Sequence, residues 1–117
     1  MTGPRLLLRV EGAAVAAAAL LVYFHHGYSW WLLVALIIAP DLAFVGYLRG
    51  PRTGAAFYNS THTYTAPLAL GAAGDLIESR TTIAIALTWI VHIGVDRVLG
   101  YGLKYPTAFK HTHLARV

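Results

Sequence analysis

The stretch "TWIVHIGVDRVLGYG", residues 88–102, decides the fold of this chain. Most of it is apolar enough to enter a bilayer, yet it carries His92 and Asp96, and Arg97 follows at once. Positions i and i+4 share one face of an α-helix, so the imidazole and the carboxylate point the same way. Both groups are costly inside a membrane unless they meet partners. The stretch therefore predicts a transmembrane helix whose polar face is turned toward other helices.

The composition of the whole chain favours an integral membrane protein. Of its 117 residues, 57% are hydrophobic and 12% are charged, whereas soluble domains usually carry about 25% charged residues. The net charge of +4 does not indicate nucleic-acid binding, because the basic residues fall at the ends of apolar stretches. The chain has no cysteine, which excludes disulfides, thiolate metal sites and iron–sulfur clusters.

Four apolar stretches can be recognised, each close to the roughly 20 residues that a helix needs to cross the hydrocarbon core. Short connections rich in Gly, Pro and polar residues separate them, as expected between helices. We therefore expect an all-α, integral membrane four-helix bundle that forms one domain over residues 1–117. The expected spans are residues 6–24, 30–48, 55–73 and 81–101, followed by an interfacial tail at 102–117.

The distribution of basic residues predicts the orientation of the bundle. With a cytoplasmic amino terminus, eight of the nine Lys and Arg residues lie on the cytoplasmic side, and Arg80 alone lies on the other. Cytoplasmic loops of membrane proteins carry such an excess of Lys and Arg. We expect both termini to be cytoplasmic, with the lipid bilayer as the main partner of the chain.

Six ionisable or amide side chains of the four expected spans fall at one depth. At 1.5 Å per helical residue, they lie about 8–13 Å from the cytoplasmic ends. Pro40 predicts a helix break that turns Asp41 toward the bundle interior. Polar glue between helices is one explanation for such a layer, but its size favours a functional site. The members are Glu11 on the first span, Asp41 on the second, Asn59 and His62 on the third, and His92 and Asp96 on the fourth.

Histidine and carboxylate ligands without thiolates suit Zn²⁺, Mn²⁺ or Fe²⁺, and carboxylates shift the preference toward the harder ions. We expect Glu11 to be the general base on a metal-bound water, whose pKa the metal lowers toward neutrality. Asn59 and Lys104 are the further catalytic candidates. The expected metal ligands are Asp41, His62, His92 and Asp96.

Basic and aromatic side chains flank the expected site. Arg49 and Arg52, together with Lys104, would form a cationic rim at the cytoplasmic mouth, suited to a lipid or another phosphate-bearing substrate. Membrane topology alone also explains these charges. Tyr58 shares a helix face with the third-span candidates, and Tyr101 marks the inner interface. We count the two arginines and the two tyrosines as candidates for ligand binding.

Two long fragments carry a resemblance to a known family. The sequences "APDLAFVGYLRGPRTGAAFYNSTHTY" (39–64) and "HIGVDRVLGYGLKYPTAFKHTHL" (92–114) resemble small, four-span bacterial membrane proteins of unknown function, over essentially the whole chain. The resemblance implies a four-span fold in the bacterial cytoplasmic (inner) membrane. It implies no activity.

Three short motifs are similar to a second group, inner-membrane proteins described as metal-dependent hydrolases. The motifs are Pro40-Asp41, Thr61-His62 and His92-x3-Asp96, in that order. This likeness implies hydrolysis at a metal ion. The chain departs from the pattern because Ala43 stands where those proteins have a second acidic residue, and because it lacks the His-Arg-Gly-x-x-His string before the second motif. We expect Glu11 to replace the missing acidic ligand.

A non-enzymatic membrane protein is the alternative from another class. In one version, His62 and His92 are the axial ligands of a haem, although a haem favours an apolar slot over carboxylates. In another version, the polar layer is an internal lock in a homo-oligomer or in an accessory subunit of a larger membrane complex. A visible spectrum distinguishes the haem protein, and copurifying partners distinguish the subunit.

Overall fold

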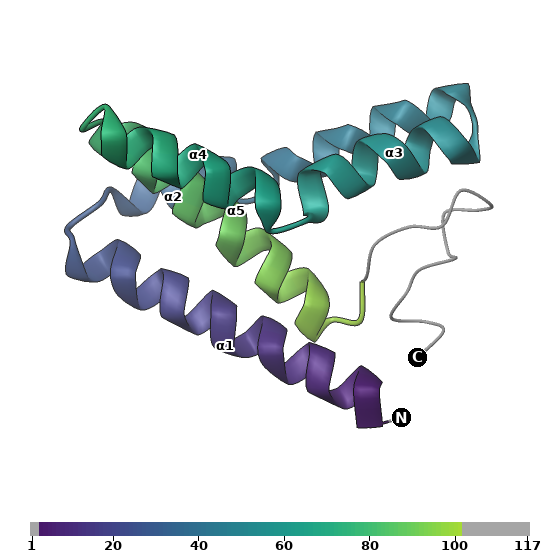
Figure 1. The fold of residues 1–117 in the computed structure, drawn as a ribbon, viewed down its shortest axis with the longest axis horizontal. Coiled ribbons are helices and arrows are strands. Elements are labelled where there is room, and N and C mark those ends of the chain that lie inside the picture. Colours follow the sequence, from purple (N-terminus) through teal and green to yellow (C-terminus); the bar gives the residue numbers. More distant parts are fainter. Residues whose placement is uncertain (1–2, 102–117) are drawn as a thin grey trace.

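The computed structural model describes residues 3–101, which form five α-helices and one 3-10 helix and contain no strand (Figure 1). The predicted all-α fold is confirmed. The expected interfacial tail and Lys104 lie outside the described residues. The helices are α1 Gly3–His25, α2 Trp30–Leu36, η1 Ala39–Arg49, α3 Pro51–His62, α4 Thr65–Leu76 and α5 Arg80–Val98.

Within the described residues, three segments are long and apolar enough to cross a membrane. They are Gly3–His25, Trp30–Arg49 and Arg80–Val98. The second of these contains α2 and η1, with a break between them. The stretch at 55–73, expected as one span, is instead divided between α3 and α4. The orientation of the chain in the membrane stays a prediction.

The break between α2 and η1 follows from Pro40. Proline has no backbone N–H, so the helical hydrogen bond to the carbonyl four residues earlier cannot form. The Asp41 N–H then bonds to the Ile38 carbonyl at 3.0 Å, in the tighter i→i+3 pattern of η1. This pattern leaves the Ile37 carbonyl available to a side chain from another helix.

The break between α3 and α4 follows from Pro67. In a continuous helix, the Pro67 ring would clash with the Thr63 carbonyl. The chain avoids the clash because Thr63 is extended, with φ −100° and ψ 144°. Pro67 then lies in the first turn of α4, where an N–H has no helical partner in any case.

The helical hairpin formed by η1 and α3 positions one side of the candidate site. Gly50, with φ +108°, makes the turn between η1 and α3 in the left-handed region that favours glycine. The two helices pack side by side in antiparallel directions (Figure 1). The start of η1, which carries Asp41, therefore lies beside the end of α3, which carries His62.

Helix α5 lies between α1 and α4 and packs on both (Figure 1). The buried residues of α1 are small, except for Tyr23, and recur at steps of three and four. A Cβ atom added at Gly94 would lie 2.7 Å from the Gly12 carbonyl oxygen and 2.9 Å from the Ala16 Cβ. Small residues at such spacing let two membrane helices approach closely.

The outer surface of the described residues is rich in large apolar side chains. Leu21 and Leu42 are each 73% exposed, and Leu48 is 87% exposed. The buried side chains, in contrast, include His62, His92 and Arg97. An apolar exterior around a polar interior is the arrangement expected of a helical protein surrounded by lipid.

Candidate metal centre

Four ionisable side chains from three segments meet in the interior of the molecule, and we call them the His/Asp group. Each offers one ligand atom, and the four atoms lie within 4.8 Å of one another. The group could hold a metal ion. Its members are Asp41 on η1, His62 at the end of α3, and His92 and Asp96 on α5.

The distances within the His/Asp group are short and similar. His62 Nε2 lies 3.1 Å from Asp41 Oδ1 and 3.3 Å from Asp96 Oδ2. His92 Nε2 lies 3.1 Å and 3.2 Å from the same two oxygens. The two Nε2 atoms are 3.1 Å apart. Ligands held about 2.0–2.1 Å from a tetrahedral ion are roughly 3.3–3.4 Å apart. These five distances are therefore within a few tenths of an ångström of the spacing around such an ion, and the two carboxylate oxygens lie at most 4.8 Å apart.

Hydrogen bonds to backbone carbonyls assign the protons of both imidazoles. His62 Nδ1 donates to the Tyr58 carbonyl at 2.9 Å, and His92 Nδ1 donates to the Ile37 carbonyl. In a neutral imidazole with the proton on Nδ1, Nε2 is an acceptor. Four acceptor atoms, two of them on carboxylates, then face one point. Metal-ligating histidines commonly bind a carbonyl through the other ring nitrogen in this way.

The two helix breaks supply the groups that hold this arrangement. The carbonyl that accepts from His92 belongs to Ile37, at the break ahead of η1. Thr61 Oγ1 lies 3.1 Å from the Pro40 carbonyl oxygen and 2.9 Å from His62 Nδ1, and so connects the two breaks. A continuous helix would have used the Ile37 carbonyl internally, so the break is what makes this contact available.

Helix α5 also binds the carbonyls left unpaired at the end of α3. The Trp89 indole N–H donates to the Thr61 carbonyl. The buried Arg97 guanidinium donates to the His62 carbonyl at 2.9 Å and to the Tyr101 carbonyl at 3.1 Å. These bonds hold the end of α3, which carries His62, against α5, which carries His92 and Asp96.

Tyr58 packs directly on one of the imidazoles. Its ring stacks on His62 with the centroids 3.7 Å apart and the planes at 4°. Both side chains are buried. The structure thus places Tyr58 where it orients the His62 ring, and its predicted role in ligand binding stays a prediction.

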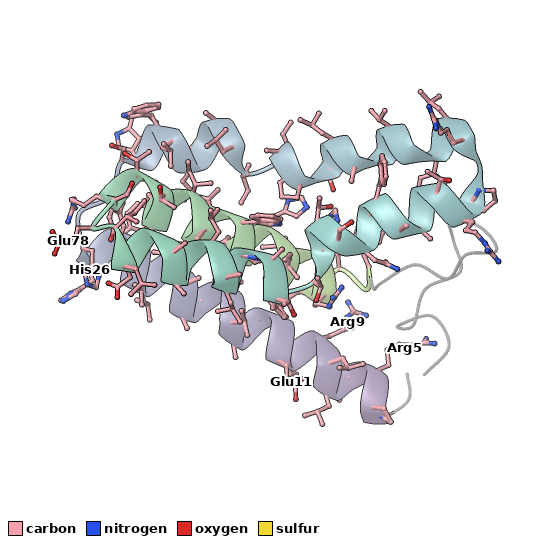
Figure 2. The ribbon with its side chains drawn as sticks, turned by 45° about the horizontal axis from the view of Figure 1, so that its top comes forward. Arg5, Arg9, Glu11, His26 and Glu78 are labelled. Carbon is pink, nitrogen blue, oxygen red and sulfur yellow. The ribbon has the colours of Figure 1, made fainter. Side chains whose placement is uncertain are left out.

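Glu11 does not join the His/Asp group. Its side chain is exposed on α1 and points outward from the bundle (Figure 2). The expectation that α1 adds an acidic group to the site is wrong, because α1 turns Gly12 and Ala16 toward α5 instead. Glu11 therefore replaces no missing ligand, and nothing places it as a base.

The other predicted residues lie around the group rather than in it. Asn59 is half-buried on α3, and Tyr101 is 53% exposed just beyond α5. Arg49 and Arg52 are exposed at the turn between η1 and α3. That turn is about 15 Å along the helices from the group. The two arginines therefore do not form a rim directly at the His/Asp group.

Sequence comparison identifies the family of the chain. The family described as "Domain of unknown function (DUF4260)" matches residues 5–117. No curated protein and no solved structure matches the chain. The predicted resemblance to a membrane-protein family of unknown function agrees with this result, and the likeness to metal-dependent hydrolases rests on three short motifs alone. Because the match covers nearly all of its residues, the chain belongs to the DUF4260 family.

Proposed function

We propose that the His/Asp group binds one divalent transition-metal ion inside a bacterial cytoplasmic membrane, and that the ion activates water to hydrolyse a lipid or another phosphate-bearing substrate. The observation that carries the proposal is the set of four converging acceptor atoms. Both imidazoles use their Nδ1 protons on backbone carbonyls, which leaves their Nε2 lone pairs beside two carboxylates. A cation at the centre satisfies all four atoms at once.

The donor set and its spacing favour Zn²⁺. Two imidazoles and two carboxylates without a thiolate suit Zn²⁺, Mn²⁺ and Fe²⁺. Five of the six distances among the ligand atoms are 3.1–3.3 Å, close to the spacing around a tetrahedral ion, and the sixth, between the two carboxylate oxygens, is at most 4.8 Å. Mn²⁺ prefers more oxygen ligands in an octahedral arrangement, so it would need added water.

Within the proposal, Asp41 is the general base. Its side chain is 37% exposed, against 13% for Asp96, so the group is most accessible on the η1 side. Asp41 approaches both imidazoles through Oδ1. A water on this exposed side would bind as a fifth ligand beside the four protein ligands, and Asp41 Oδ2 is suited to take its proton. This role replaces the one that we predicted for Glu11.

The same distances argue against the haem alternative. Axial nitrogens about 2.0 Å from one iron, on opposite faces of a haem, would be about 4 Å apart. Here they are 3.1 Å apart, with both carboxylates in contact. A structural lock needs only one doubly protonated imidazole that donates to a neighbouring carboxylate, so metal content is what separates it from a metal centre.

Metal content tests the binding step. The full chain is purified in mild detergent without chelator, and its elements are counted for the wild type, His92→Ala and His26→Ala. His26 lies in an exposed loop outside the group, so its variant is the matched control. We expect close to one transition-metal ion per chain in the wild type and the control, and little in His92→Ala. A folded wild type that takes up no metal even from added Zn²⁺ would leave the group as a polar lock.

Turnover tests the hydrolytic step. The metal-loaded protein is given anionic phospholipids in mixed micelles, and released phosphate or head group is measured. We expect activity that a chelator removes and that re-added metal restores. Asp41→Asn keeps the shape of the side chain but removes the base, so at equal metal content it should lower kcat by about 10²–10⁴-fold. A fully loaded protein that hydrolyses none of these lipids would favour the accessory-subunit alternative.

A further inference from the structure

An apolar groove of about 250 Å³ lies beside the His/Asp group. It runs along the junction of α2 and η1, and its other walls come from α3 and α5. The lining residues are Leu36, Ala39, Pro40, Thr61, Ile85 and Trp89.

The groove and the His/Asp group share their walls. Pro40 precedes Asp41, and Thr61 precedes His62. Consecutive Cα atoms are about 3.8 Å apart, so each of these lining residues is next to a ligand. Trp89 lies one helical turn before His92 on α5. The groove therefore lies next to the His/Asp group, although none of the four members of the group lines it.

One face of α5 changes from apolar to polar along this path. Ile85 and Trp89 line the groove, whereas His92 and Asp96 belong to the His/Asp group. These four residues follow at steps of four, three and four, so they share a face of the helix. About 10 Å of helix separates Ile85 from His92. This face suits an amphiphile with a hydrocarbon part at one end and a polar part at the other.

The polar atoms in the groove walls are already bound within the protein. Thr61 Oγ1 bonds to the Pro40 and Tyr58 carbonyls, and the Trp89 indole N–H bonds to the Thr61 carbonyl. The walls thus present mainly carbon atoms to the space between them. Such a surface stabilises hydrocarbon and offers little to a polar ligand.

The position of the groove indicates that its occupant comes from the bilayer. Five of its six lining residues are partly exposed, and the neighbouring Ile38 is 68% exposed. The α2–η1 segment that forms one wall is one of the three membrane-span candidates. The volume lies below the roughly 300–1,000 Å³ of sites that enclose a whole drug-sized ligand. It suits one hydrocarbon chain with a head group outside it.

We infer that the groove holds the hydrocarbon chain of a lipid substrate while the polar end of that lipid lies at the His/Asp group. The inference deepens the proposed function, since it names the part of the substrate that the protein recognises apart from the reacting group. It also places Trp89 in contact with the bound hydrocarbon.

A chain-length series tests the inference. Alkyl phosphates from ethyl to octyl are titrated into the metal-loaded full chain in detergent, with inorganic phosphate as the head-group control. Trp30→Phe and Trp31→Phe leave Trp89 as the only one of the three tryptophans, so its emission reports on the groove. Each buried methylene should raise the affinity by about fourfold, the equivalent of roughly 0.8 kcal/mol, until the groove is full.

Two matched variants separate the groove from the detergent micelle. Ala39→Phe fills the groove, whereas Ala35→Phe adds the same ring to an exposed position on the same segment. Partition into micelles is common to both variants. We expect the dependence on chain length to disappear in Ala39→Phe and to persist in Ala35→Phe. Equal dependence in the two variants, or none in the parent protein, would overturn the inference.

A second variant and a metal count keep the outcome interpretable. If Ala39→Phe does not fold, Ile85→Phe narrows the groove from the α5 wall and should give the same loss. Metal is counted in every sample. Bound metal without dependence on chain length overturns the groove and leaves the metal centre. Dependence on chain length without bound metal overturns the proposed function and leaves a lipid-binding groove.

Discussion

Two of the contacts that helix α5 makes differ in almost every respect. Toward α1 it presents Gly94, and the two backbones approach so closely that an added Cβ would meet the Gly12 carbonyl. Toward η1 and α3 it presents His92 and Asp96, whose partners are ionisable side chains. The first contact joins two unbroken helices. The second involves η1, which begins at a helix break beside the contact, and α3, which ends at another.

The difference shows how an interior membrane site can be built from a short chain. Close packing of small residues needs no free backbone group, so α1 stays regular. The break near Pro40 supplies the Ile37 carbonyl that orients His92, whereas His62 bonds to the Tyr58 carbonyl within α3. The break near Pro67 leaves the last carbonyls of α3 free to bind Trp89 and Arg97 of α5. The breaks are therefore part of the site.

Gly94→Ala should have the largest effect on stability among the variants that test this comparison. Its Cβ would lie 2.7 Å from the Gly12 carbonyl oxygen, so α1 must move away. We expect a loss of about 2 kcal/mol from overpacking, measured by unfolding in a detergent–denaturant titration. Metal content of the folded protein should stay unchanged.

Gly71→Ala is the matched control for that variant. Its Cβ would meet only the Ala86 Cβ, at an ordinary 3.4 Å. In a helix interior, alanine should then stabilise the protein by up to about 1 kcal/mol. If the two substitutions had equal effects, the α1–α5 contact would not depend on close approach of the backbones.

Thr61→Val should weaken the contact of α5 with η1 and α3, and it should cost less stability than Gly94→Ala. The hydroxyl joins the two breaks through the Pro40 carbonyl and contacts His62 Nδ1. We expect a loss of about 1 kcal/mol in stability and a loss of at least tenfold in metal affinity, measured by competition with a chelator. Ser60→Ala is the control, because its exposed hydroxyl bonds only to carbonyls of its own helix. Equal metal affinities would show that Thr61 does not orient the ligand.

Glu11→Gln should have the smallest effect. The carboxylate is exposed on α1 and points away from the bundle (Figure 2). We expect metal affinity and turnover to stay within about twofold of the wild type, since a surface substitution changes stability by less than about 0.5 kcal/mol. A strong loss of bound metal in this variant would mean that α1 contributes to the site after all.

The contrast between Asp41 and Glu11 shows what the sequence could predict. Depth along the helices and the motifs around His62 and His92 identified four residues that the structure brings together. Glu11 has the same depth as Asp41, yet it faces outward. Distance from a helix end fixes the level of a residue but not its face, and on α1 the small residues Gly12 and Ala16 determine that face.

One residue in the sequence does indicate that the third expected span is divided. Pro67 stands in the middle of the stretch at 55–73, where it cannot continue a helix from Thr63. The carbonyl of Ile37, in contrast, could not be identified, because any residue supplies the same backbone oxygen. Its role depends on the position of α5, which is a consequence of packing. Arg97 was visible as a basic residue, but its bond to the His62 carbonyl was not.

The most direct test of the metal centre is X-ray absorption at the zinc edge of the Zn²⁺-loaded full chain. The structure predicts about four nitrogen or oxygen ligands at roughly 2.0–2.1 Å, with outer-shell scattering from two imidazole rings, those of His62 and His92. Substitution of either histidine by alanine should remove one imidazole contribution or the ion itself. A spectrum without imidazole scattering, or one unchanged by both substitutions, would place the ion elsewhere and contradict the assignment of the His/Asp group as the metal centre.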